Sequence, residues 1–385
     1  MAETTIVILI DGLGFELARR YEFRPKAFGE LARLETILGF SGAALASIFT
    51  GLWPDEHGLW MMYSFAESSS PFSWLRMLPA SVSSRRLWLR RLMRWNLEVV
   101  HRVKGYYSLY DVPRAVLPHL DIPAREDIFA AGGAGRARTI FDVVSQRRLP
   151  SRVWDYHGDE EGAFRELIER AGRGDGGFYL LYTARLDAEL HRTGTGGAGI
   201  PSRLEWYARM IAKVEQAASA GGRSARIFVL GDHGMGDVTK HVDVMASVGS
   251  LGLDIPRDFV PFYDSTMARF KVRTERARGA LMELLSAWRF GRVLTEAEKE
   301  RLHVSFGDGR FGDVIFLVEP GSIILPSFMG REPVVAMHGY DPAAPCMPSV
   351  LLSNTALPSR ELSICDVASI VLPGFQAARG GRRDD

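Results

Sequence analysis

Residues 5–14 have the sequence TIVILIDGLG, in which six apolar or β-branched residues precede Asp11 and a glycine-rich turn. A continuous apolar run of this length is typical of a strand buried on both faces, as strands of parallel sheets are. Four further runs share this character: RVWDY (152–156), FYLLYTARL (178–186), RIFVLG (226–231) and SVLLS (349–353). We expect all five to be buried parallel strands.

Helical patterns lie between these runs. The segments DEEGAFRELIERAG (159–172) and RLEWYARMIAKVEQAASA (203–220) place apolar residues at helical spacing. Alternation of strands and helices predicts an α/β fold with a doubly wound, mostly parallel sheet flanked by helices. Ligands of such sheets bind at the C-terminal ends of the strands, so polar residues that follow the runs are candidates for a site.

Two stretches interrupt this alternation. Residues 61–130 are aromatic, basic and broken by prolines, and residues 255–335 contain charged helical and strand-like segments. We expect both to be insertions that cap the C-terminal edge of the sheet. The catalytic core would then comprise residues 1–60, 131–254 and 336–376, and the charged tail 377–385 would be frayed.

The composition is that of a globular protein, with 46% hydrophobic and 24% charged residues among 385. The formal net charge of +1 provides no overall field for nucleic acid, so no specific nucleic-acid binding is expected. Two cysteines, Cys346 and Cys365, are too few for a disulfide framework and suggest a reducing compartment. Without a signal-like N-terminus or an apolar run of membrane-spanning length, the sequence predicts a cytoplasmic location.

Carboxylate and imidazole side chains follow the apolar runs. Asp187 and His191 are four residues apart, which places both on one face of a helix or turn. Taken singly, each such residue has an ordinary reading as a turn former, a helix cap or a loop histidine. Taken together at one sheet edge, oxygen and nitrogen donors suit zinc, or less often manganese or iron. The candidate metal ligands are Asp11, Asp187, His191, Asp232, His233 and His338.

The order of these motifs resembles a known family. Asp-Gly follows the first strand, Ser41 stands nine residues before Thr50 of a Thr-Gly pair, and Asp-x-x-x-His follows. The segments DHGM (232–235) and HGYD (338–341) complete the set. This series resembles the alkaline phosphatase superfamily, and within it the type I phosphodiesterase and nucleotide pyrophosphatase family most closely.

The resemblance implies a site with two divalent metal ions, zinc or else manganese. One ion would be held by Asp187, His191 and His338. The other would be held by Asp11, Asp232 and His233 together with Ser41, whose hydroxyl would be the attacking nucleophile. A helix that starts near Gly42 would stabilise the attacking oxygen and the phosphoryl group with its N-terminal dipole. The resemblance thus implies hydrolysis through a phosphoseryl intermediate.

The sequence departs from the family pattern at one substrate-binding position. An asparagine 21 residues beyond the nucleophile is replaced by Met62, and we expect Tyr63 or an arginine of an insertion to take over its contact with a phosphate oxygen. Gly42 is a second candidate for substrate binding. Leu45 stands where sulfatases have an arginine, which argues against sulfate-ester hydrolysis. His57 in PDEHG is expected to be a structural turn residue rather than a metal ligand.

A phosphodiesterase or nucleotide pyrophosphatase acting on a small-molecule phosphoester is the function these motifs favour. The alternatives are a phosphomonoesterase, a phosphonate hydrolase or a phosphoryl-transferring mutase of the same superfamily. A further alternative, of another class, is a metal-bound binding protein without turnover. The oligomeric state is left open.

A basic amphipathic segment occupies residues 82–104, with seven Lys or Arg residues against Glu98 alone among acidic residues. Such a segment is typical either of a cap helix with solvated arginines or of peripheral contact with anionic lipid. The first interpretation is favoured from the sequence.

Overall fold

The computed structural model describes residues 4–25, 28–29, 31–67, 69–79 and 82–378. Its central sheet has seven strands in the order β17-β2-β16-β7-β1-β6-β5. Their bounds are β1 (Thr4–Ile10), β2 (Ala32–Glu35), β5 (Ser151–Trp154), β6 (Gly177–Thr183), β7 (Ala225–Leu230), β16 (Ser349–Ser353) and β17 (Glu361–Ser363).

The predicted α/β fold with a mostly parallel sheet is confirmed, with two strands as exceptions. β5 is parallel as expected, but it lies at the edge of the sheet and is largely exposed rather than buried. β1 pairs in parallel with both β6 and β7, but β16 is antiparallel to β7 and to β2. The expectation of a parallel strand at 349–353 is therefore wrong. The segments before β16 lie at the edge of the sheet where β7 ends. The chain enters β16 from that edge and therefore runs opposite to β7. An apolar run shows that a strand is buried and does not show its direction.

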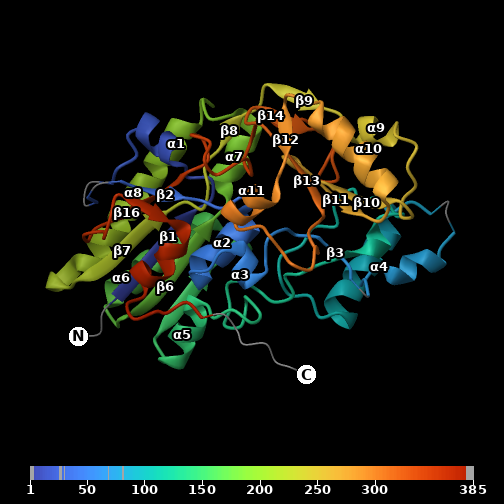
Figure 1. Cartoon of the computed structure of the whole chain (residues 1–385). Helices are drawn as coiled ribbons and strands as arrows, with labels where there is room; N and C mark the ends of the chain where they lie inside the picture. Colours follow the sequence, from blue (N-terminus) through green and yellow to red (C-terminus); the bar gives the residue numbers. More distant parts are fainter. Residues whose placement is uncertain (1–3, 26–27, 30, 68, 80–81, 379–385) are drawn as a thin grey trace.

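Helices cover both faces of the sheet, as Figure 1 shows. Ile6, Ile8 and Ile10 of β1 pack against one helical layer, whereas Val7 and Leu9 pack against the other. The segments predicted as helices at 159–172 and 203–220 are helical. The first layer holds α1 (Phe15–Arg20), α6 (Glu160–Arg173), α7 (Arg185–Thr193) and α8 (Ile200–Ser219), and the second holds α2 (Ser41–Thr50), α5 (Ile140–Gln146) and α12 (Val367–Val371).

A second apolar core joins elements of the two predicted insertions. Phe72 and Leu97 share it with Phe262 and Phe316. The domain boundaries themselves stay a prediction. The main helices and strands of the two insertions are β3 (Ser64–Phe65), α4 (Leu87–Trp95), the π-helical turn η2 (Asn96–Val100), β4 (Leu120–Asp121), α10 (Glu275–Ser286) and α11 (Glu296–Arg301). The second insertion also forms an antiparallel sheet of β10 (Phe259–Tyr263), β11 (Met267–Val272), β13 (Val314–Val318) and β12 (Gly291–Val293).

Short elements connect this second core with the edge of the central sheet. β9 pairs in parallel with β14, and β8 pairs antiparallel with β15. Their bounds, with the neighbouring helices, are α3 (Pro54–His57), β8 (Gly236–Asp237), β9 (Lys240–Val242), α9 (Val244–Gly249), β14 (Ser322–Ile324) and β15 (Ala336–Met337).

Among the helices of the described residues, none combines the length and the apolar character that crossing a bilayer requires. Of the tail that was expected to be frayed, residues 379–385 lie outside the described part of the chain.

Candidate active site

The structure gathers all six predicted metal ligands and Ser41 at one edge of the central sheet. Asp11 directly follows β1, and Asp232 and His233 follow β7. Asp187 and His191 lie on α7, the helix after β6. The remaining ligand, His338, precedes β16, whose antiparallel direction puts its N-terminal end at this same edge. The topology, rather than closeness in sequence, therefore assembles the site.

Asp11, Asp232 and His233 form one buried group of candidate ligands. The Nε2 atom of His233 is 3.2 Å from Asp11 Oδ1 and 3.4 Å from Asp232 Oδ2. One potential ligand atom from each of the three residues lies within 4.8 Å of the others. This spacing allows all three to reach a single cation.

Asp187 is the centre of the second group. Its Oδ1 atom is 3.4 Å from His191 Nε2 and 3.8 Å from His338 Nε2. The ring of His233 stacks on that of His338 with centroids 3.6 Å apart, so Asp187, His233 and His338 also lie within mutual ligand distance. His233 thus lies between the two groups. The division of ligands between two ions stays a prediction.

Backbone carbonyls orient two of the histidines. His191 Nδ1 lies 2.8 Å from the carbonyl oxygen of Ala336, and His233 Nδ1 lies 3.0 Å from that of Gly234. A carbonyl oxygen only accepts, so each Nδ1 carries the proton and donates it. In the neutral ring this arrangement leaves the Nε2 lone pair facing the carboxylates, which is how protein histidines are prepared for a metal.

The charge balance of the site is unfavourable without a cation. Burial and the charge of Asp11 raise the pKa of Asp232 to about 8. Burial lowers the pKa of His233, but the charges of Asp232 and Asp11 outweigh it and raise the value to about 10. Within the described residues, Asp187 Oδ1, Asp232 Oδ2 and His338 Nδ1 are buried without a hydrogen-bond partner. Buried carboxylates with unused lone pairs and adjacent imidazoles fit divalent metal ions.

Ser41 is the first residue of α2, and the N-cap position belongs to Phe40. Its hydroxyl therefore does not serve as the cap, and it points toward the carboxylates instead. The Oγ atom is 3.4 Å from Asp11 Oδ1 and 3.0 Å from His233 Nε2. A hydroxyl at a helix N-terminus beside a metal-type ligand set can act as a nucleophile toward an anionic centre.

Two neighbouring features were not predicted from the sequence. The hydroxyl of Tyr182 donates to Asp11 Oδ2 and so fixes the carboxylate. The signal for this contact was the parallel register of β1 and β6, which places Tyr182 beside Leu9. Gly12 has a φ of +75°, and a Cβ atom there would lie 3.2 Å from Asp187 Cα. Glycine at this position lets α7 approach the end of β1.

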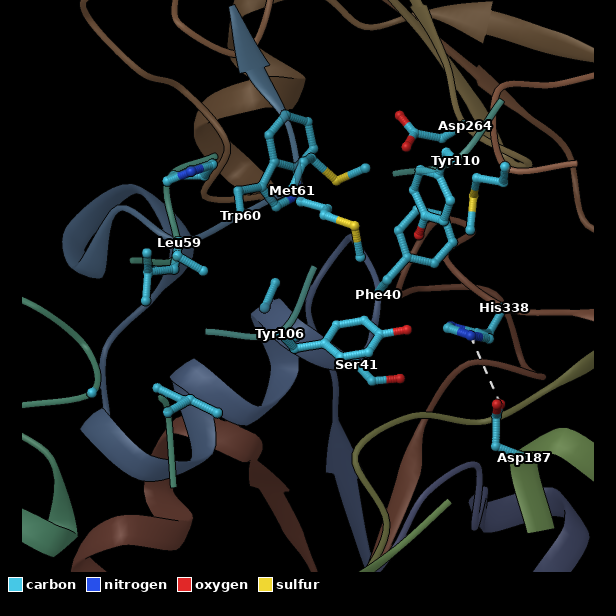
Figure 2. A pocket seen from close by; sticks show the side chains of 18 of the residues that line it. Phe40, Ser41, Leu59, Trp60, Met61, Tyr106, Tyr110, Asp187, Asp264 and His338 are labelled. Carbon is cyan, nitrogen blue, oxygen red and sulfur yellow. Dashed lines mark ion pairs between the residues drawn. The ribbon is translucent and has the colours of Figure 1, made fainter. Parts of the chain in front are cut away.

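A cavity of about 310 Å³ opens in front of Ser41 (Figure 2). Its walls are mainly apolar and aromatic, and no Lys or Arg occurs among the described residues that line it. Both insertions contribute to it. Its lining residues include Phe40, Ser41, Gly42, Met62, Tyr106, Tyr110, Asp264, Met329 and His338.

Of the two residues expected to bind substrate, Gly42 lines the cavity and Tyr63 does not. Gly42 lines the cavity directly after Ser41, and its role in substrate binding stays a prediction. Tyr63 is buried away from it, because its hydroxyl donates to the carbonyl oxygen of Ser108. The expected contact from Tyr63 is therefore not supported by this geometry. An arginine from an insertion is likewise not among the described lining residues.

Tyr106 presents its hydroxyl where Tyr63 was expected to act. In Figure 2 this hydroxyl points into the space between Ser41 and His338. Burial and the charge of Asp11 raise the pKa of Tyr106, so the hydroxyl keeps its proton at neutral pH and remains a hydrogen-bond donor. Sequence reasoning missed Tyr106 because it lies 65 residues beyond Ser41, in an insertion without regular periodicity.

Three solved structures with this architecture share its topology over nearly the whole chain. Murine ectonucleotide pyrophosphatase/phosphodiesterase 5 matches with a TM-score of 0.68 at 14% identity, over 96% of this chain and 94% of its own. The human protein of the same name has a TM-score of 0.66 at 14% identity, with the same coverage of 96% and 94%. An inactive variant of the murine protein in complex with AMP has a TM-score of 0.67 at 14% identity, again over 96% and 94%. At this identity the likeness shows the fold.

No curated protein matches the chain closely enough in sequence to count as a relative. The family described as type I phosphodiesterase/nucleotide pyrophosphatase, in contrast, matches residues 5–341. This range extends from β1 to the HGYD segment and includes every candidate ligand. The chain therefore belongs to the type I phosphodiesterase/nucleotide pyrophosphatase family.

Proposed function

We propose that the protein is a metal-dependent hydrolase of phosphodiesters or nucleotide pyrophosphates that uses Ser41 as its nucleophile. Family membership supports a hydrolase of this general type. The observation that carries the finer proposal is the position of Ser41 Oγ, at the start of α2, next to Asp11 and His233 and open to the cavity.

Two divalent cations fit the donor set. Asp187, His191 and His338 would hold one, and Asp11, Asp232, His233 and Ser41 the other. Mixed carboxylate and imidazole donors favour zinc, with manganese as the alternative. Bound divalent cations lower the pKa of a hydroxyl or a water molecule and balance the charge of phosphoryl oxygens.

The reaction then has two displacements at phosphorus. Ser41 Oγ loses its proton to solvent and forms a bond to phosphorus, and the leaving group departs with the electron pair of the broken P–O bond. This gives a phosphoserine. Water then attacks phosphorus and releases a proton to solvent, the bond between phosphorus and Ser41 Oγ breaks, and Oγ takes up a proton to restore the hydroxyl. The N-terminus of α2, where Gly42 follows Ser41, favours the negative charge in both steps.

The lining of the cavity supports a diester rather than a monoester. A monoester dianion brings one more negative charge than a diester, and a cationic side chain would stabilise that charge. The described lining residues offer no Lys or Arg for it. Aromatic walls from Phe40, Tyr106 and Tyr110 suit a flat apolar group such as a nucleobase. A small-molecule nucleotide is in keeping with the AMP complex of the structural neighbour.

The test compares bis-p-nitrophenyl phosphate, p-nitrophenyl phosphate and a nucleotide panel as substrates for the purified chain. We expect the diester to be preferred and Ser41→Ala to lower kcat by at least about 10³-fold. Ser41→Thr keeps a hydroxyl and is the matched control, expected to retain measurable turnover.

Metal analysis of the same samples completes the experiment. Wild-type protein and Ser41→Ala should contain equal amounts of divalent metal, because the carboxylates and imidazoles remain. A strong monoester preference would contradict the choice of substrate. Unchanged turnover in Ser41→Ala would remove the proposed nucleophile, and active protein free of divalent metal would remove the ions.

A further inference from the structure

A stripe of exposed apolar side chains runs along α4 and the π-helical turn η2. Trp88, Leu92, Trp95 and Val99 follow one another at spacings of four, three and four residues, so they lie along one side of the helix. Trp88 is 49% and Trp95 54% exposed, and Leu87, at the start of the helix, is 75% exposed. With Val100, this short segment holds half of the exposed large apolar side chains among the described residues.

The opposite side of α4 already meets the packing needs of the helix. Leu89, Met93 and Leu97 follow at four-residue spacing and are buried in the apolar core shared by the two insertions. Asn96 also donates through its side-chain nitrogen to the carbonyl oxygen of Pro71. The exposed stripe is therefore additional to the face that holds the helix in place. A contiguous exposed apolar patch of this kind marks an interaction surface.

Positive charge accompanies the stripe. Arg86, Arg91, Arg94 and Arg102 form no ion pair with any residue that the structure describes, whereas Arg85 is paired with Asp111 and Lys104 with Glu126. The single acidic residue of the segment, Glu98, accepts a hydrogen bond from the Tyr107 hydroxyl. The local charge is thus strongly positive on a chain whose formal net charge is only +1.

We propose that this surface docks on an anionic lipid bilayer. This α4 surface comprises Leu87, Trp88, Leu92, Trp95, Val99 and Val100 with Arg86, Arg91, Arg94 and Arg102. Apolar side chains of such a helix enter the boundary between headgroups and acyl chains, where Trp is favoured. Arginines at the same level bind lipid phosphates and can keep their charged heads in water. Anionic lipid satisfies both parts of the surface at once.

Charge and side-chain type argue against two other occupants. A second copy docked by a two-fold axis would place the same unpaired arginines opposite one another, because such a contact is made by identical patches. Single-stranded nucleic acid would satisfy the arginines, but it binds by stacking of bases on aromatic rings. Leu87, Leu92, Val99 and Val100 have no ring on which a base could stack.

The experiment is sedimentation of the full chain with vesicles of phosphatidylcholine, with and without phosphatidylglycerol, at low and high salt. Wild-type protein should bind the anionic vesicles at low salt, bind less at high salt and leave the neutral vesicles unbound. Arg91→Gln/Arg94→Gln should lower the partition coefficient about 30-fold, at about tenfold per 1.4 kcal/mol and about 1 kcal/mol per arginine. Trp88→Ala/Trp95→Ala should lower it by at least about tenfold.

A matched control is available on the exposed face of α8. Arg209→Gln/Lys213→Gln removes the same charge at a distance from α4 and should leave binding unchanged. Thermal unfolding establishes that each variant is folded, and all four substituted residues of the α4 surface are exposed.

Several results would overturn the proposal. One is that wild-type protein fails to bind anionic vesicles at low salt. Another is that wild-type protein and both α4 double variants bind these vesicles equally. A concentration-dependent dimer abolished by Trp88→Ala/Trp95→Ala would assign the surface to a second copy instead. Tight binding of a single-stranded polynucleotide in place of the vesicles would assign it to nucleic acid.

Discussion

Tyr106 offers a hydroxyl in place of the asparagine that the family resemblance implies as a contact for a phosphate oxygen. Met62 occupies that position and lines the cavity, but its thioether cannot donate a hydrogen bond. The hydroxyl of Tyr106 points into the space beside Ser41 and stays protonated, because burial and Asp11 raise its pKa. Tyr106 is therefore positioned to donate to a phosphoryl oxygen. Tyr106 is 58% exposed, so removal of its hydroxyl should have little effect on folding.

Replacement of Tyr106 by Phe removes this donor and keeps the ring. We expect kcat/KM for a diester to fall about 10²-fold, the usual effect of losing one hydrogen-bond donor to a developing charge. Thermal unfolding should be unchanged. Tyr110→Phe, on another part of the same cavity wall, is the control and should retain nearly full activity. Equal losses in the two variants, or none in Tyr106→Phe, would show that the hydroxyl has no such role.

At the scale of elements, the helix that carries Ser41 is held by its neighbour α3. His57, the last residue of α3, is buried and accepts the backbone N–H of Leu59 at Nδ1. The proton therefore resides on Nε2, which donates to the hydroxyl of Ser47 in α2 at 3.0 Å. This neutral tautomer makes both contacts, and the structural role expected for His57 agrees with them. Burial lowers the pKa of His57 to about 3.

This pKa predicts a dependence of stability on acid. The folded-state pKa lies below the ordinary value of 6.5, so between pH 6.5 and about 3 the unfolded chain binds the additional proton. Stability should therefore fall as the pH is lowered through this window. His57→Gln should cost about 1 to 3 kcal/mol at pH 7 and flatten the pH dependence. Urea unfolding at pH 7 and pH 5 measures both effects. If the free energy of unfolding changed between the two pH values as much in His57→Gln as in the wild type, the pH dependence would not come from His57.

The elements differ in how far the sequence determines them. Long apolar runs identified β1, β6 and β7, because burial on both faces leaves a continuous pattern. The short strand β2 and the edge strand β17 left no such pattern, since each has only a few residues and partly exposed side chains. The direction of β16 depends on where the preceding 80 or so residues leave the chain, and local sequence does not contain that information.

The same limit applies to the site. The candidate metal ligands could be predicted because each lies next to a strand end or on the helix that follows a strand, and the fold brings these positions to one edge of the sheet. Tyr106 could not, because it lies in an irregular segment whose path depends on packing between the two insertions.

At the scale of the whole molecule, an ion-pair network links the second insertion to the loop that carries His338. Arg292 of β12 contacts Asp341, three residues after His338, through Nη2 at 2.5 Å. Its Nε atom is 2.7 Å from Glu298 Oε1 on α11. Arg301 adds a longer contact to Asp341 at 3.4 Å. The HGYD motif therefore provides both a candidate metal ligand and the residue that anchors its loop to the insertion.

Acid should break the ion pairs of this network over a defined pH range. The backbone N–H of Thr295 and the Arg292 guanidinium lower the pKa of Glu298 to about 2, although burial opposes them. Because this folded-state pKa lies below the ordinary value of 4.5, the unfolded chain binds the proton first on acidification. The stabilisation is complete above about pH 4.5 and is lost as the pH falls toward about 2.

Arg292→Ala tests the network as a link between the two parts of the molecule. At pH 7 it should lower the free energy of unfolding by about 1 to 2 kcal/mol, since the pairs are about one-third exposed and partly screened. The deficit should shrink as Glu298 and Asp341 become protonated. The control Arg209→Ala removes an exposed 3.6 Å pair with Glu205 on α8 and should cost less than about 0.5 kcal/mol.

Because Asp341 anchors the loop of His338, Arg292→Ala should also weaken divalent-metal binding, measured by titration of metal-depleted protein. Metal affinity equal to that of the control would separate the network from the site, and its effect would then be on stability alone.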